Sequence, residues 1–213
     1  EKSTKQLTQK LAATPSLFGE IRQPKATYIA LPEVSSERRD FIPVGFLQPE
    51  TIPSNKIQTI SGGSLFHFGV LCSTMHNAWM RYTCGRLESR YSYSATIVYN
   101  NYPWPGFANE PLSDKHRNAI EQAAQGVLDA RAHFPESSLA DLYDPLTMPP
   151  ALLKAHHKLD TAVDAAYVPS GGKKAYASDA ERVAFLFELY QRITSLPPAL
   201  AAKKTRKSKA IES

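Results

Sequence analysis

Short stretches rich in β-branched and aromatic residues occupy the first third of the chain. They are residues 27–31, 41–47 and 56–60, and the last of them alternates apolar and polar positions. Runs of this kind predict half-buried strands. Pro43 inside the second run favours an edge strand or a bulge. A fourth run of the same character, residues 95–99, predicts another strand.

Helical periodicity separates these strands and then takes over the rest of the chain. From Ser64 to about Cys84, apolar residues recur at steps of three and four, which predicts one helix that Gly85 ends. Beyond Pro111 the pattern is helical throughout. Helices are predicted from Ser113 to about His133, a short turn from Ser138, one after Pro149-Pro150, and one that begins at Ser178-Asp179-Ala180-Glu181 and stops before Pro197.

The order of these elements predicts an α+β chain, with a small mixed α/β unit followed by an all-helical C-terminal unit. We assign residues 1–13 to a linker from an upstream domain, 14–108 to the α/β unit, 109–198 to the helical unit and 199–213 to a basic, disordered tail. The first residue is not Met, so we expect these 213 residues to be a piece of a longer protein.

Composition narrows the class of protein only slightly. The formal net charge is +5, but five basic residues lie within 203–209, so a surface for a polyanion must come from arrangement and not from bulk charge. Cys72 and Cys84 lack metal-site spacing and suit a reducing cytoplasm. No apolar run reaches the ~18 residues of a membrane span, and no signal peptide is recognisable. A cytoplasmic protein without a membrane partner is predicted.

A polar segment from Arg81 to Pro105 carries most of the candidate chemistry. Glu88 and Arg90 are two residues apart, so in an extended segment their side chains point the same way. Arginine can donate to guanine O6 and N7, and glutamate can accept from cytosine N4, so the two could contact both halves of a G·C pair. The alternative is a surface ion pair that contributes little.

Four further side chains in this segment could hold DNA phosphates, although each alone is typical of an ordinary surface: Arg81, Arg86, Ser89 and Ser92. The six histidines show no metal spacing, and His156 with Asp160 is expected on a solvated helix face. Residues 100–105 do not match the Asn-Pro-Pro-aromatic motif of amino-group methyltransferases, so their aromatic rings are expected to pack on the core. Because no catalytic motif is found, this chain is predicted to bind while chemistry occurs elsewhere.

Several motifs together resemble one known family, the MmeI-like enzymes. The likeness to their target recognition domain lies in SLFHFGVLCS (64–73), CGRLESRYSYS (84–94) and YNNYPWP (99–105), and LYDPLTMPP (142–150) resembles their C-terminal helical domain. The family consists of restriction–modification enzymes and related methyltransferases. The resemblance implies an upstream domain that transfers a methyl group from S-adenosylmethionine to adenine N6 in double-stranded DNA.

The family's paired specificity positions fall on Glu88 and Arg90, and a second pair falls near Glu33 and Asn55. The glycine-rich cofactor loop and the catalytic motif are absent from these residues, so we expect no cofactor in this chain and assign S-adenosylmethionine to the upstream methyltransferase domain. Whether the whole enzyme also cleaves DNA is left open. The alternative function is a protein–protein interaction module.

Overall fold

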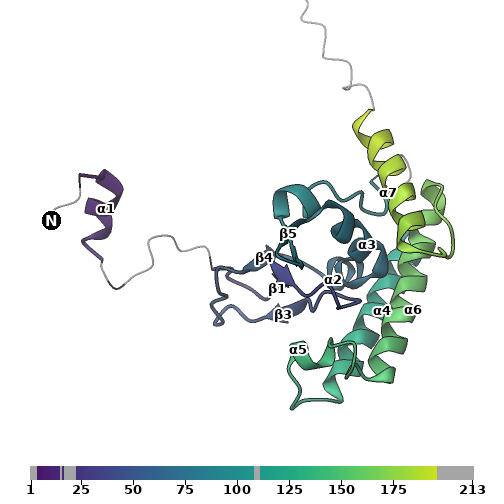
Figure 1. Ribbon diagram of the computed structural model, residues 1–213, viewed down its shortest axis with the longest axis horizontal. Coiled ribbons are helices and arrows are strands. Elements are labelled where there is room, and N and C mark those ends of the chain that lie inside the picture. Colours follow the sequence, from purple (N-terminus) through teal and green to yellow (C-terminus); the bar gives the residue numbers. More distant parts are fainter. Residues whose placement is uncertain (1–3, 15, 17–22, 108–110, 196–213) are drawn as a thin grey trace, which may run out of the picture.

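A computed structural model describes residues 4–14, 16, 23–107 and 111–195, and shows the strands beside a set of packed helices (Figure 1). In chain order the elements are α1 (Gln6–Leu11), β1 (Tyr28–Pro32), β2 (Val34–Ser35), β3 (Gly45–Leu47), β4 (Ile57–Ser61), α2 (Leu65–Cys72), α3 (Thr74–Thr83), β5 (Gly85–Leu87), β6 (Arg90–Ser92), the π-helical turn η1 (Ala95–Tyr99), α4 (Asp114–Ala132), α5 (Leu139–Leu142), α6 (Pro150–Tyr167), the 3₁₀ turn η2 (Val168–Ser170) and α7 (Asp179–Thr194). Small sheets followed by helices confirm the α+β prediction. The predicted tail, 199–213, lies outside the described residues.

Two small antiparallel sheets meet at Glu33. Their strand orders are β3-β1-β4 and β2-β6-β5. Glu33 lies between β1 and β2. Its backbone N–H donates to the Lys56 carbonyl at 2.8 Å, and its carbonyl accepts from the Tyr93 N–H at 2.7 Å. One residue therefore joins the two sheets through its own main chain.

The strand predicted over 41–47 is shorter than the pattern indicates. Only Gly45–Leu47 pairs with β1. Phe41, Ile42 and Val44 are buried without pairing in a sheet, and Pro43 between them has no N–H to offer a ladder. The run predicted as one strand is therefore a buried stretch outside the sheets followed by three paired residues.

The single helix predicted from Ser64 to Cys84 is two helices that break at Ser73. Ser73 has extended backbone angles, φ −74° and ψ 155°. Its hydroxyl donates to the Val70 carbonyl at 2.7 Å and accepts from the His76 N–H at 3.3 Å. The Ser73 hydroxyl thus gives a hydrogen-bond partner to a backbone carbonyl at the end of α2 and to a backbone N–H at the start of α3, where the chain turns.

The strand predicted at 95–99 is instead the π-helical turn η1. The Asn100 N–H donates to the Ala95 carbonyl at 2.9 Å. The Trp79 indole donates to the Val98 carbonyl at 3.0 Å, and the Asn101 amide donates to the Thr96 and Ile97 carbonyls at 2.8 and 3.0 Å. These side chains supply the partners that a neighbouring strand would have given, so tertiary contacts override β-propensity.

One hydrophobic core runs through both sequence units. Helix α2 packs on α4 and α6, and α3 packs on α7. Trp79 of α3 lies with its ring centroid 5.0 Å from that of Phe187 in α7. Gly69 of α2 allows a close crossing, since a Cβ there would lie 2.9 Å from Ile120 Cγ2 and 3.2 Å from Leu159 Cδ1. The helical unit is therefore the other half of the core on which the sheets rest.

Matched Gly→Ala substitutions in two helices are expected to change stability in opposite directions. Ala is the better helix former by about 0.5–1 kcal/mol, and at Gly126 of α4 an added Cβ meets nothing within 4 Å. At Gly69 the added methyl overpacks the crossing, which we expect to destabilise the fold by about 1 kcal/mol net. Urea unfolding of G69A and G126A checks both signs. Equal shifts for the two variants would contradict the close crossing.

Candidate nucleic-acid interface

The polar segment singled out in the sequence forms a tight hairpin on the surface. Leu87 pairs with Arg90, so Glu88 and Ser89 make a two-residue turn between β5 and β6. Glu88 has φ 59°, and it is the one non-glycine residue with positive φ in the described part of the chain. Such turns normally use Gly or Asn, and a Glu there carries strain on the order of 1 kcal/mol. Strain of this kind is concentrated at functional sites.

The hairpin tip brings the first predicted pair of base-contacting residues together. Arg90 Nη2 donates to Glu88 Oε2 at 2.7 Å, and the two side chains are 46% and 76% exposed. The sequence prediction that the Glu88 and Arg90 side chains point the same way assumed an extended segment. In the structure a turn and an ion pair bring the two side chains together instead. An exposed pair of this kind contributes little to stability. The carboxylate and the guanidinium are therefore accessible to another molecule.

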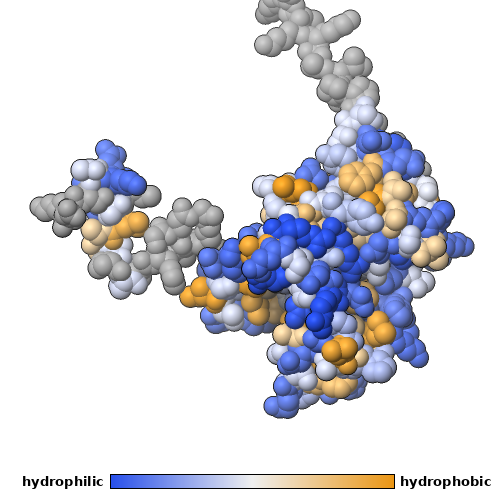
Figure 2. All heavy atoms as spheres, viewed as in Figure 1, coloured by the Kyte–Doolittle hydropathy of each residue, from blue (hydrophilic) through white to orange (hydrophobic). Residues whose placement is uncertain are grey.

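The predicted phosphate-contacting residues of the hairpin lie on both of its strands and in its turn. Arg86 lies on β5, Ser89 is in the exposed turn, and Ser92 ends β6 half-buried, opposite Gly85 and Val34. The Arg86 guanidinium stacks 4.1 Å from the centroid of the Tyr91 ring and donates to the Ser89 carbonyl at 3.0 Å. Hydrophilic side chains gather near the centre of the view in Figure 2, where Figure 1 labels β4 and β5.

The second predicted pair lies at the junction of the two sheets. Glu33 is half-buried and Asn55 is exposed in the turn before β4. Lys56, which the sequence did not single out, has its Nζ 3.5 Å from Glu33 Oε2. Residues 33 and 56 become neighbours because β1 and β4 are antiparallel with Pro32 opposite Ile57. Lys56 could be recognised as a neighbour of Glu33 only from this strand register, which the sequence alone does not give.

Arg81 has partners other than the predicted phosphate. Its Nη1 lies 2.5 Å from Asp179 Oδ2, and Nη2 donates to the carbonyls of Arg39 (3.3 Å) and Asp40. Its side chain is 18% exposed. The guanidinium links α3 to the first turn of α7 and to the loop before β3, so its contacts indicate a structural role, and the phosphate contact stays a prediction. Nothing in a single sequence placed Asp179, 98 residues away, beside it.

Removing this link is expected to destabilise the protein by about 2 kcal/mol in the variant Arg81→Met, less than the ~3–5 kcal/mol for a fully buried pair. Asp179 remains in the first turn of α7, where the helix dipole favours a negative charge. Urea unfolding of the 213-residue chain measures the loss. Arg90→Met, which breaks an exposed pair, is the matched control and should change stability little. Equal stabilities for the two variants would contradict the structural role of Arg81.

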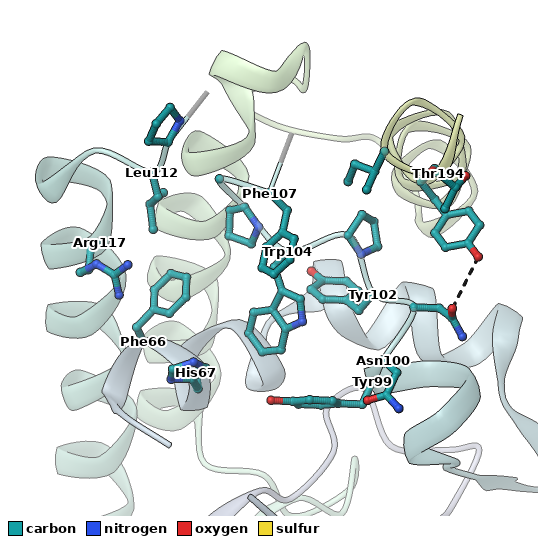
Figure 3. A pocket seen from close by; sticks show the side chains of 17 residues that line it. Phe66, His67, Tyr99, Asn100, Tyr102, Trp104, Phe107, Leu112, Arg117 and Thr194 are labelled. Carbon is teal, nitrogen blue, oxygen red and sulfur yellow. Dashed lines mark hydrogen bonds between the residues drawn. The ribbon is translucent and has the colours of Figure 1, made fainter. Parts of the chain in front are cut away.

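The aromatic segment 99–105 lines a cavity of about 790 Å³ between η1, α4 and α7. Tyr102 is buried, and its hydroxyl accepts a hydrogen bond from that of Tyr167 at 2.8 Å. Trp104 meets Tyr99 edge-on at 5.5 Å (Figure 3). As predicted, these rings pack on the core and the prolines turn the chain. Arg117 stacks 4.7 Å from the Phe66 ring centroid at the rim of the cavity.

The helix face predicted to be solvated around His156 is buried. His156 is fully inaccessible, stacks on Phe41 with centroids 4.1 Å apart, and its Nε2 accepts from the Tyr143 hydroxyl at 2.7 Å. Asp160 accepts hydrogen bonds from the N–H and hydroxyl of Thr74, both at 2.7 Å. The i,i+4 pair is therefore not a ligand set, because its members serve separate core contacts.

Two further classes of feature are missing from the described residues. No cluster of three or more His, Cys, Asp or Glu side chains there is placed to hold a metal ion. None of the helices in the described ranges has the length and apolar character that crossing a membrane requires.

Comparisons with known proteins identify both parts of the chain. Residues 1–106 match the family model "MmeI, target recognition domain", and residues 112–197 match "MmeI, C-terminal domain". DNA methyltransferase A of Bacillus subtilis (strain 168) is 41% identical over 194 residues, which are 91% of this chain and 21% of that protein. The solved structure of the type IIL restriction-modification enzyme MmeI in complex with DNA is 50% identical and has a TM-score of 0.81, over 92% of this chain and 25% of that one. The chain belongs to the MmeI family, and it comprises that family's target recognition domain followed by its C-terminal domain.

Proposed function

We propose that this chain is the DNA-recognition part of an S-adenosylmethionine-dependent DNA adenine-N6 methyltransferase. One observation carries the proposal. The fold shared with MmeI, whose solved structure contains DNA, places an exposed carboxylate and an exposed guanidinium together on a strained hairpin tip. The chain spans 25% of the length of MmeI and 21% of the length of DNA methyltransferase A. The methyl transfer is therefore assigned to an upstream domain of the same protein.

The hairpin tip would contact one G·C base pair in the major groove. Arg90 would donate to guanine O6 and N7, and Glu88 would accept from cytosine N4. A wrong base pair at this position would leave both charged groups without partners on the bases, and a mismatch of this kind typically costs about 1–3 kcal/mol. The hydroxyls of Ser89 in the turn and Ser92 at the end of β6 are proposed to contact phosphates, which fix position without specifying sequence.

Glu33 and Asn55 would contact a second base pair. The Glu33 carbonyl accepts from the Tyr93 N–H, so the main chain of Glu33 is fixed to the segment that follows the hairpin. Lys56 holds the Glu33 carboxylate in place from the neighbouring turn.

The remaining parts of the protein complete this proposal. Residues 14–108 form the recognition unit, and residues 109–198 brace it through the shared core. The upstream domain would hold S-adenosylmethionine and the target adenine, which must leave the base stack to react. We place the protein in the cytoplasm, where free thiols such as Cys72 and Cys84 are stable.

Sequencing-based mapping of methylated adenines, after DNA is exposed to the complete protein, tests the proposal. A defined motif containing N6-methyladenine is the expected result. A protein that is folded and binds S-adenosylmethionine but leaves DNA unmethylated would overturn it. The logarithm of the DNA-binding constant is also expected to fall linearly with the logarithm of the salt concentration. A DNA-binding constant that does not depend on salt would argue instead for a protein–protein interaction module.

A further inference from the structure

Arg86 connects the two strands of the recognition hairpin through its side chain. It lies directly opposite Tyr91 in the β5–β6 ladder. Its guanidinium stacks 4.1 Å from the Tyr91 ring centroid, and its Nη1 donates to the Ser89 carbonyl at 3.0 Å. The planar group therefore contacts a residue in the middle of the hairpin and a residue at its turn at the same time.

The hairpin tip needs such a connection. Strands β5 and β6 have three residues each, and every residue of β5 is exposed. Two-stranded hairpins of this size are marginally stable in water, and the positive φ of Glu88 adds strain at the turn. Tyr91 is 8% exposed and belongs to the hydrophobic core, and β6 also pairs with β2. The chain of contacts from Tyr91 through Arg86 to Ser89 thus links the tip to the rigid body of the protein.

We infer that Arg86 is a positioning residue for base-pair specificity, which holds the turn so that Glu88 and Arg90 meet the base pair in one fixed geometry. The inference rests on the proposed function. It differs from the phosphate contact expected from the sequence, because the guanidinium is already engaged within the hairpin. Lysine cannot replace it in this role, since an ammonium lacks the planar face and the fork of donors that stacking and carbonyl contact use together.

The two roles of Arg86 predict different results for Arg86→Lys and Arg86→Gln in the complete protein. Methylation rates are measured on a duplex with the cognate base pair and on duplexes substituted at the pair assigned to Glu88 and Arg90. A positioning role predicts that both variants lose discrimination at this one base pair by about 10-fold, within the ~1–3 kcal/mol of a specific contact. The salt dependence of binding by R86K should match that of the unsubstituted protein.

A phosphate role predicts the opposite pattern and would overturn the inference. R86K would then resemble the unsubstituted protein, while R86Q would weaken binding to all duplexes and lower the salt slope by about 1. A uniform loss of activity in both variants, or no change in either, would also overturn it. The same substitutions at Arg38, an exposed arginine outside the hairpin, control for a general change of charge.

A measurement without DNA separates this inference from the proposed function. Amide hydrogen exchange of residues 85–92 in the 213-residue chain is expected to be faster in R86K and R86Q, and unchanged in β1 and β4. Tyr91→Leu should reproduce this effect and Tyr91→Phe should not, because only the aromatic ring is needed for stacking. Unaltered amide protection of the hairpin in R86K and R86Q would refute the positioning role of Arg86 whether or not the protein recognises DNA. An unsubstituted protein without sequence preference would refute the proposed function instead.

Discussion

Exchanging the two charges of the hairpin tip is expected to change the accepted base pair while methylation continues. In the double variant Glu88→Lys, Arg90→Asp, the cation and the carboxylate trade places. The ion pair that joins them at 2.7 Å can re-form in reverse, and the turn retains a non-glycine residue at the same strained position. Donor and acceptor now face the opposite bases, so a C·G orientation or a different pair should replace the original one.

The single variants are expected to be much worse than the double variant. Glu88→Lys places two cations side by side, and Arg90→Asp places two carboxylates side by side, so neither can match a base pair that offers a donor on one base and acceptors on the other. We expect each to methylate duplexes with any base pair at this position at least ~100-fold more slowly than the unsubstituted protein methylates its own site, corresponding to ~3 kcal/mol at one contacted pair.

Motif mapping of methylated DNA, together with rates on matched duplexes, distinguishes the outcomes. A new base at one position and normal rates on the new site would support the assignment. An unchanged motif with normal activity in the double variant would falsify the base-contacting role of the pair. Lys115→Glu, in an exposed first turn of α4, tests whether a charge reversal elsewhere has any such effect.

Local chemistry made some of these features predictable from the sequence. Helix starts at Ser113, Ser138 and Ser178 each follow from a hydroxyl that accepts an N–H of the first turn, and such a signal needs only a few neighbouring residues. The proximity of Glu88 and Arg90 was likewise predictable, because they are two residues apart in the sequence. Whether they contact bases stays a prediction.

Features that depend on distant residues were not predictable. The run at 95–99 has strand propensity, and only the Trp79 and Asn101 side chains explain its π-helical form. Arg81 looked like a free cation because Asp179 is far away in sequence. His156 was predicted on a solvated helix face, whereas Phe41 from the first half of the chain stacks on it.

Acidification is expected to destabilise the fold chiefly through two buried histidines. His76 is fully buried, with Nδ1 3.1 Å from the Leu71 carbonyl and Nε2 3.0 Å from the Tyr93 hydroxyl. Both contacts suit a neutral ring that donates from Nδ1 and accepts at Nε2. Burial lowers the pKa of His76 to about 3. Burial, and then the nearby Arg131 guanidinium, lower the pKa of His156 to about 3.

The sign of the effect follows from proton binding. An unfolded histidine has a pKa of about 6.5, so between that pH and about 3 the unfolded state binds more protons and stability falls as the pH falls. At pH 5 each histidine contributes a loss of about 2 kcal/mol. Asp164 acts in the opposite direction, because burial raises its pKa to about 6 despite Arg182 at 3.0 Å. Its gain of about 1 kcal/mol leaves a net loss of about 2–3 kcal/mol.

Urea unfolding at pH 7.5 and pH 5 measures this loss, and His76→Gln assigns part of it. Glutamine does not titrate, so the variant should be less stable at pH 7.5 but lose about 2 kcal/mol less on acidification. Equal stability of the unsubstituted chain at both pH values would contradict the assignment, as would an undiminished pH dependence in H76Q. His76 contacts the hydroxyl of Tyr93, whose N–H donates to Glu33 at the junction of the two sheets. Opening at low pH should therefore appear in the exchange of the hairpin amides before that of α4 and α6.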